Sequence, residues 1–145
     1  MDVSATLTRR LAGLLLTVVE RRDFDWAFGF AGGVAISASC PWRILIDGRI
    51  ALTVSDDRQK FGLPAPVDAQ DQTLRLLSQK PIERVAVRPD TGDLSIIFPE
   101  DAALELLNMS SGYEGWQINM PGLNVIATGG GELAVIATPT PSPGL

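Results

Sequence analysis

The sequence contains no histidine and only one cysteine among its 145 residues. The lack of histidine removes the usual imidazole general base, the commonest metal ligand and the side chain that titrates near neutral pH. A single cysteine cannot form an internal disulfide, and without a histidine to activate it we interpret Cys40 as an inert, buried thiol. One unpaired cysteine is also typical of a reducing compartment, so we expect the protein to be cytoplasmic.

Positive charge is also scarce. The chain has only two lysines, its ten arginines are scattered, and its formal net charge is −5. Nucleic acids and anionic membrane surfaces bind clustered lysines and arginines, so we expect neither of them as a partner. The apolar run from Leu11 to Val19 is much shorter than the ~20 residues of a membrane-spanning helix. It is followed by Glu20 and two arginines where a signal peptide would have small residues.

The usual cofactor and metal motifs are missing as well. The glycines at 129–131 are not followed by a lysine or by a helical pattern, so they indicate a turn or bulge and not a phosphate-binding loop. No acidic stretch has the spacing of a calcium-binding loop. We therefore expect no cofactor and no metal.

The apolar content, in contrast, is high enough for a stable core. Hydrophobic residues make up 46% of the chain, and a chain of this length buries roughly 68% of its unfolded surface without help from disulfides or metals. We expect a single domain over residues 1–137. Three prolines follow in the last eight residues, which predicts a flexible, Pro-rich tail over 138–145.

Alternating apolar residues around turn-forming pairs predict a series of hairpins. Asp47-Gly48 is the strongest signal, at the centre of a hairpin over 42–54. A two-residue turn at Gly32-Gly33 would place the aromatic residues of 26–30 on one face with Ala35, Ser37 and Ser39. Further hairpins are expected at 82–98 and 116–127, and further strands at 14–20, 102–108 and 132–137.

Two segments have helical patterns. Asp68 is a suitable N-cap for a helix over about 68–79, which Pro81 would end, and a short helix is expected at 4–11. Residues 55–67 lie between the hairpin at 42–54 and the helix at about 68–79. They contain Gly62 and two prolines, which predict a loop. The fold class is therefore α+β and mostly antiparallel, with a sheet that curls strongly, forms a half-barrel or splits into a sandwich.

The stretch SSGYEGW at 110–116 combines turn formers with the only tyrosine of the chain. Trp116 is in phase with the apolar residues that follow it, so we expect its ring in the core. Gly112 and Gly115 let the backbone turn tightly, and we expect Glu114 to be held by hydrogen bonds inside the protein. This favours an architectural corner, with a ligand-binding site as the alternative.

Two other polar groups are candidates for chemistry. Asp56 or Asp57 together with Glu114 would make a small hydrolase or ligand-binding enzyme if the carboxylates lay within ~9.5 Å of each other. Arg43 either recognises a carboxylate ligand or pairs inside the protein with an acid such as Asp47 or Glu114.

Four motifs together resemble a family of small uncharacterised bacterial proteins, over about residues 11–137. They are Trp42-Arg43, the D-x-x-Q-x-F-G-L-P loop that ends at Pro64, Thr91 to Leu94, and S-x-x-Y-E-x-W ending at Trp116. Proteins of this appearance are grouped with immunity proteins of bacterial toxin systems. The resemblance implies a small acidic cytoplasmic protein that binds a partner protein and performs no chemistry. The candidate binding residues are Trp42, Arg43, Asp56, Asp57, Phe61, Tyr113, Glu114 and Trp116.

Two kinds of protein contact are therefore expected. The first is with a partner that has a basic surface, because the acidic charge of the chain would steer such a partner toward it. The second is a homodimer, because antiparallel sheets have edges to protect and the chain has few lysines with which to protect them. The almost wholly apolar strands at 14–20 and 132–137 are the expected edges.

Overall fold

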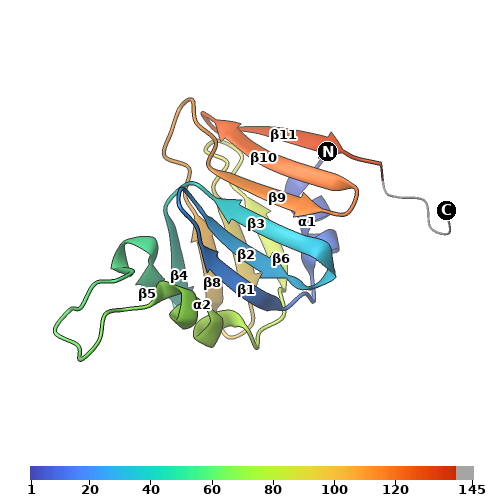
Figure 1. Cartoon of the computed structure of the whole chain (residues 1–145). Coiled ribbons are helices and arrows are strands. Elements are labelled where there is room, and N and C mark those ends of the chain that lie inside the picture. Colours follow the sequence, from blue (N-terminus) through green and yellow to red (C-terminus); the bar gives the residue numbers. More distant parts are fainter. Residues whose placement is uncertain (140–145) are drawn as a thin grey trace.

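A computed structural model describes residues 1–139 and shows an α+β protein built mainly of antiparallel strands (Figure 1). The helices are α1 (Val3–Leu11) and α2 (Ala69–Leu77). The strands are β1 (Leu16–Arg21), β2 (Trp26–Phe30), β3 (Val34–Ala38), β4 (Trp42–Ile46), β5 (Arg49–Thr53), β6 (Arg84–Val87), β7 (Leu94–Phe98), β8 (Ala102–Leu106), β9 (Trp116–Met120), β10 (Leu123–Gly129) and β11 (Glu132–Ala137).

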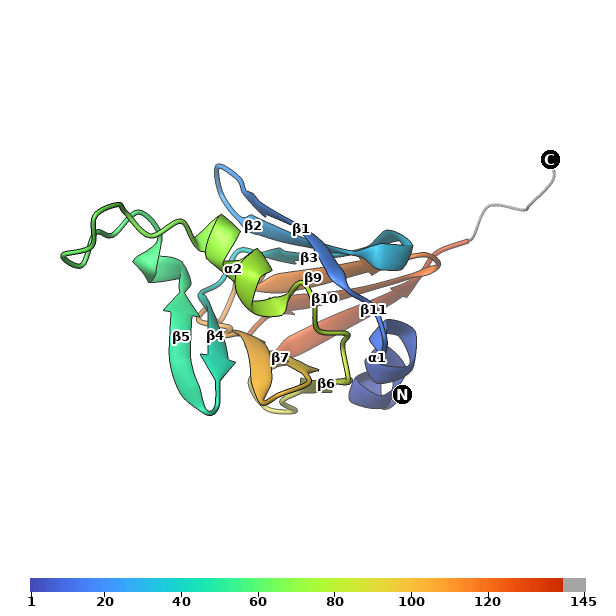
Figure 2. The same ribbon diagram turned by 90° about the horizontal axis from the view of Figure 1, so that it is seen from below.

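The strands form two separate sheets. The six-stranded sheet has the order β1-β2-β3-β9-β10-β11, and the five-stranded sheet has the order β5-β4-β8-β7-β6. Every pair of neighbouring strands is antiparallel. The predicted fold class is confirmed. Of the three arrangements left open by the sequence, the structure has two sheets that share one core (Figure 2).

The core lies between the sheets because the inner faces of both sheets are apolar. Along β2, β3, β7, β8, β9 and β10 buried residues alternate with partly exposed ones. Trp42 on β4 joins the two layers, since its ring meets the rings of Trp26 and Phe28 on β2 edge to face. The ring centroids are 5.1 and 5.2 Å apart.

Most of the predicted hairpins are confirmed. Asp47 and Gly48 both have positive φ, 52° and 75°, as a tight turn between β4 and β5 requires. The register of β6 with β7 places Val85 opposite Ile96. The hairpin at 116–127 places Met120 opposite Leu123. The strands predicted at 14–20 and 132–137 are β1 and β11, the two edges of the six-stranded sheet.

The predicted register of the β2–β3 hairpin is wrong. The connection has three residues, Ala31–Gly33, so Phe28 lies opposite Ile36 and Phe30 opposite Val34. The aromatic face of β2 therefore continues into the apolar residues of β3, not into Ala35 and Ser37. A shift of one residue exchanges the two faces of a strand, and burial of Ile36 favours the observed register.

Each helix covers one side of the sandwich. Asp68 caps α2 as predicted, because its carboxylate accepts hydrogen bonds from the backbone N–H groups of Gln70 and Asp71. α2 packs against β1 and β5, so it lies across the side where the edges of the two sheets meet and not on the face of one sheet (Figure 2). α1 packs against β6 at the opposite side.

The tail predicted at 138–145 falls outside the described residues from residue 140 onward. Neither of the helices in residues 1–139 has the length and apolar character that crossing a membrane requires.

Candidate functional site

Two of the eight candidate residues, Trp42 and Trp116, are core residues. Trp116 is 1% exposed, and its Nε1 donates a hydrogen bond to the backbone oxygen of Gly92 over 2.8 Å. This confirms the prediction that its ring is in the core. Trp42 is equally buried beneath the aromatic residues of β2. Neither side chain can contact a partner while the protein is folded, so both have a structural role in the core.

Arg43 lies on the outer face of the five-stranded sheet. Its Nε is 2.8 Å from Oε1 of Glu105, the residue directly opposite on β8. Arg43 therefore pairs with an acid inside the protein, which was one of the two expectations, but the acid is Glu105 and not Asp47 or Glu114. Cross-strand neighbours on one face of a sheet lie ~5 Å apart at their Cβ atoms, which makes Glu105 the nearest carboxylate once β4 and β8 pair.

The corner at 107–115 is held by the side chains of Ser110 and Asn108 and by Asp93, whose Oδ1 accepts from the backbone N–H of Asn108 over 2.8 Å. Oγ of Ser110 accepts hydrogen bonds from the backbone N–H groups of Gly112 and Tyr113, at 3.2 and 2.9 Å. Nδ2 of Asn108 donates to the backbone oxygen of Thr91 over 3.0 Å. A Cβ atom on Gly115 would lie 1.8 Å from Oδ1 of Asn108, so a larger residue there would have to displace the Asn108 side chain.

The prediction for Glu114 is wrong. This side chain is exposed, and across residues 1–139 it takes part in no hydrogen bond or ion pair. The prediction would require the backbone N–H groups of the turn to depend on a carboxylate as their acceptor. The hydroxyl of Ser110 already accepts from two of them, which leaves Glu114 free to face solvent.

An open groove of about 600 Å³ runs beside this corner. Glu114, Tyr113 and Met109 line one wall, and the β3–β4 connection at 39–41 lines the other. Cys40 is partly buried in this connection, and burial raises the pKa of its thiol to about 11. The thiol therefore stays protonated and weakly nucleophilic at neutral pH, in agreement with the inert role expected for it.

A second groove, of about 490 Å³, lies on the other side of the same 39–41 connection. It is bounded by the turn between β1 and β2, whose tip is Phe24. This turn is anchored, because Nε and Nη2 of Arg22 each lie 2.7 Å from a carboxylate oxygen of Asp25. Phe24 was not predicted as a site residue. The signal in the sequence that could have identified it is its position between Asp23 and Asp25, before the strand that begins at Trp26.

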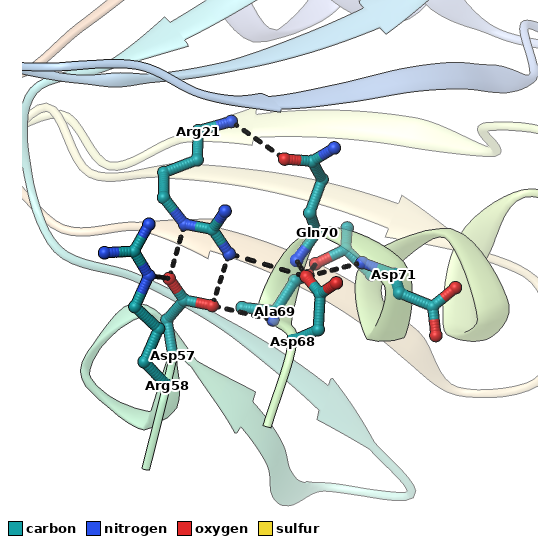
Figure 3. Close-up of polar contacts among 8 residues, drawn as sticks. Arg21, Asp57, Arg58, Asp68, Ala69, Gln70 and Asp71 are labelled. Atoms are coloured by element: carbon teal, nitrogen blue, oxygen red, sulfur yellow. Dashed lines mark hydrogen bonds and ion pairs between the residues drawn. The ribbon is translucent and has the colours of Figure 1, made fainter. Parts of the chain in front are cut away.

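The third feature is the loop between β5 and α2, which begins at an ion pair between Arg21 and Asp57 (Figure 3). Arg21 at the end of β1 binds Asp57 through two contacts, Nε to Oδ2 at 2.6 Å and Nη2 to Oδ1 at 2.7 Å. Oδ1 of Asp57 also accepts from the backbone N–H of Ala69 over 2.9 Å. The guanidinium of Arg21 lies 5.1 Å from the ring centroid of Trp26.

This ion pair shifts the pKa of both side chains. The hydrogen bond from Arg21 holds the pKa of Asp57 below its ordinary value, and the same bond raises the pKa of Arg21. Both oxygens of Asp57 are occupied, while Asp56 accepts from the backbone N–H of Thr53 over 2.9 Å. Asp56 and Asp57 therefore act as structural groups that hold the two ends of the loop.

Beyond this base the loop projects away from the sandwich, at the left of Figures 1 and 2. The backbone N–H of Arg58 donates to the oxygen of Val67 over 2.7 Å, and the N–H of Val67 donates to the oxygen of Gln59 over 2.8 Å. The ends of the loop are thus fixed, and its tip presents Phe61 and Leu63, both of which are exposed.

These three features lie at the same side of the sandwich, at the left of Figure 1, and we call this region the loop end: residues 22–25, 39–41, 57–67 and 107–115. The two grooves share residues 39–41, and the Arg21–Asp57 pair connects the strand before Phe24 to the loop that carries Phe61. Of the candidate residues, the loop end contains Asp57, Phe61, Tyr113 and Glu114, with Asp56 at its border. No cluster of carboxylates and thiols that could hold a metal ion occurs within residues 1–139.

Comparison with known proteins finds no matching family model, no matching curated protein and no matching solved structure.

Proposed function

We propose that the protein is a non-enzymatic protein-binding module that docks through the loop end. The observation that carries this proposal is the exposure of three aromatic side chains on anchored loops: Phe24 is 95% exposed, Tyr113 83% and Phe61 67%. Each stands on a segment held by hydrogen bonds or ion pairs at its base. Met109 and Leu63 add further exposed apolar surface beside them.

Such side chains are suited to protein recognition. An aromatic ring buries roughly 150–250 Å² when it enters a pocket, and it has few rotatable bonds whose freedom is lost on binding. A loop whose base is already fixed gives up less conformational entropy when it docks. The pair of grooves on either side of 39–41 would receive side chains of the partner between the projecting aromatic residues.

The net charge of the chain, −5, favours a basic partner. The loop end itself is nearly balanced, because exposed Asp23 and Glu114 are accompanied by exposed Lys60, and none of the three forms an ion pair within residues 1–139. A strongly acidic chain accelerates encounter with a basic protein. We propose the role of an immunity-like protein of a bacterial toxin system, acting in the cytoplasm, where the thiol of Cys40 would remain reduced.

The alternative of a two-carboxylate hydrolase lacks comparable support. Arg21 and the backbone N–H of Ala69 occupy both oxygens of Asp57, so this group is not free to act as a base or nucleophile. Glu114 lines a groove of which neither Asp56 nor Asp57 is part.

Affinity capture with matched variants tests the proposal. We expect Phe61→Ala and Tyr113→Ala each to weaken capture of the partner at least ~30-fold, because loss of an interface hot spot costs about 2 kcal/mol or more. Ile50→Ala is the control, since Ile50 on β5 is 58% exposed, close to the value for Phe61, but lies outside the loop end. It should bind like the parent.

All three variants should melt at the temperature of the parent, because the substituted side chains are exposed. Capture that is unaffected by Phe61→Ala and Tyr113→Ala, or that Ile50→Ala weakens equally, would contradict docking through the loop end.

A further inference from the structure

The two sheets have four edge strands, and three of them are protected. At β6 the helix α1 supplies side chains in place of a further strand. Oγ1 of Thr8 accepts from the backbone N–H of Val85 over 2.9 Å and donates to its oxygen over 3.1 Å. Oγ of Ser4 accepts from the N–H of Val87 over 2.9 Å. The outer backbone groups of β6 are thus already hydrogen-bonded.

The edges β1 and β5 are protected by α2 and by irregular pairing. Oε1 of Gln70 on α2 accepts from the backbone N–H of Arg21 at 3.3 Å. The register of β1 with β2 shifts between Leu16 and Val18, and that of β5 with β4 shifts at Ile44. Bulges and charged side chains such as Arg49 on an edge disfavour pairing with another chain.

The fourth edge, β11, is less protected within residues 1–139: its register with β10 shifts only at its start, between Ala127 and Gly129, and its one charged residue, Glu132, also lies there. Within the described residues β10 is the only strand that pairs with it. The start of α1 lines a groove together with Leu133, but neither helix makes an extensive contact with β11. Its pairing with β10 is regular from Leu123 to Ala127, and the sequence from 133 to 139 carries no charge. Val135 and Ile136 are 38% and 45% exposed. Val135 points inward, as its opposite residue Val125 does, so the second sheet does not fully cover it.

We propose that β11 pairs antiparallel with β11 of a second copy of the chain, about a twofold axis at Val135. This joins the six-stranded sheets of the two copies into one continuous sheet. With the axis at Val135, the register places Leu133 opposite Ala137 and Ala134 opposite Ile136, so that a large side chain meets a small one at each pair.

A second copy fits this edge better than an unrelated segment because the strand is complementary to itself. The register above keeps inward residues opposite inward residues, as a twofold axis perpendicular to the sheet requires. It also places Glu132 opposite Thr138, so the acidic side chains of the two copies do not face each other even though each chain is acidic. The interface is short, and we therefore expect a reversible dimer with a dissociation constant in the micromolar range.

The proposed dimer also has a consequence for docking. β11 begins at Glu132, next to the corner, where the backbone N–H of Gly130 donates to the oxygen of Ser110 over 2.9 Å. Antiparallel pairing of two β11 strands sends their starting points in opposite directions. The two loop ends would therefore face outward at opposite ends of the dimer.

Sedimentation velocity over a range of concentrations tests the dimer. The parent should move from 15.5 kDa toward about twice that mass as the concentration rises from a few to several hundred micromolar. Val135→Lys should remain at the monomer mass, because the two lysines would meet at the axis. The matched control is Val18→Lys on the opposite edge strand, where the parent side chain is also exposed. It should dimerise like the parent.

Oxidative crosslinking tests the register. In a Cys40→Ser background, Val135→Cys should form a disulfide-linked dimer, because the two residues lie opposite each other at the axis. Ile136→Cys should crosslink at least tenfold more slowly, because its opposite residue is Ala134. A parent that stays monomeric at every concentration would overturn the proposal, and so would equal crosslinking at positions 135 and 136.

Discussion

Replacing Trp116 with alanine is expected to lower the free energy of unfolding by about 3–5 kcal/mol, because it leaves a large cavity in the core. The side chain is almost wholly buried, and its indole N–H is hydrogen-bonded to Gly92 in the turn between β6 and β7. The substitution therefore removes both core packing and the bond that connects two turns. Urea denaturation followed by circular dichroism measures the change without relying on tryptophan fluorescence.

Three further variants separate the contributions at this corner. Trp116→Phe keeps an aromatic ring but leaves the oxygen of Gly92 without its donor, so we expect a loss of about 1–3 kcal/mol. Tyr113→Ala and Glu114→Ala should each change stability by less than about 0.5 kcal/mol, because both side chains are exposed. A loss for Glu114→Ala as large as that for Trp116→Ala would mean that the carboxylate holds the corner after all.

Replacing Asp57 with alanine is expected to lower the free energy of unfolding by about 2–4 kcal/mol, the second large effect. Breaking a buried ion pair by removing one partner is strongly destabilising, and here the change also removes the acceptor for the first backbone N–H of α2. We expect less than the full value for a buried pair because Arg21 is 27% exposed and regains water. The exposed pair Arg88–Asp90 is the matched control, and Asp90→Ala should produce no measurable change.

The contribution of Asp57 should also depend on pH. Arg21 lowers the pKa of this carboxyl in the folded protein. The stabilisation is therefore complete above the ordinary aspartate pKa of ~3.9 and is lost as the pH falls through the lower pKa of the folded state. Thermal melts from pH 7 to pH 2 should show the parent and Asp57→Asn converging below about pH 4. A difference that stays constant over this range would show that Asp57 acts by packing and not by charge.

The local features of the fold could be predicted from sequence because short-range chemistry determines them. Asp47-Gly48 specifies a tight turn by its positive φ angles, Asp68 begins α2 as its N-cap, and the alternation at 116–127 identifies the buried face. The edge strands β1 and β11 were also predicted, and each pairs on one side only, with its neighbour in sequence, β2 or β10.

Long-range pairing could not be predicted in this way. The paired strands β3–β9 and β4–β8 are distant in the chain, so no turn motif indicates that they pair. The partner of Arg43 could not be predicted either, because Glu105 lies opposite it only once β4 and β8 pair. The Arg21–Asp57 pair likewise spans 36 residues. Glu114 was assigned an internal role because the sequence does not show that Ser110 already serves the amides of the same turn.

Site-specific photocrosslinking tests the central claim most directly, because it reports which surface touches the partner inside the cell. A benzophenone-containing residue placed at Phe61 or Tyr113 should crosslink to one partner protein, and the same residue at Ile50 should not. Both Phe61 and Ile50 are exposed to a similar degree, so the probe reaches solvent equally well at the two positions. Docking through the loop end predicts partner adducts from positions 61 and 113 alone. Adducts from position 50 with none from 61 and 113 would contradict it.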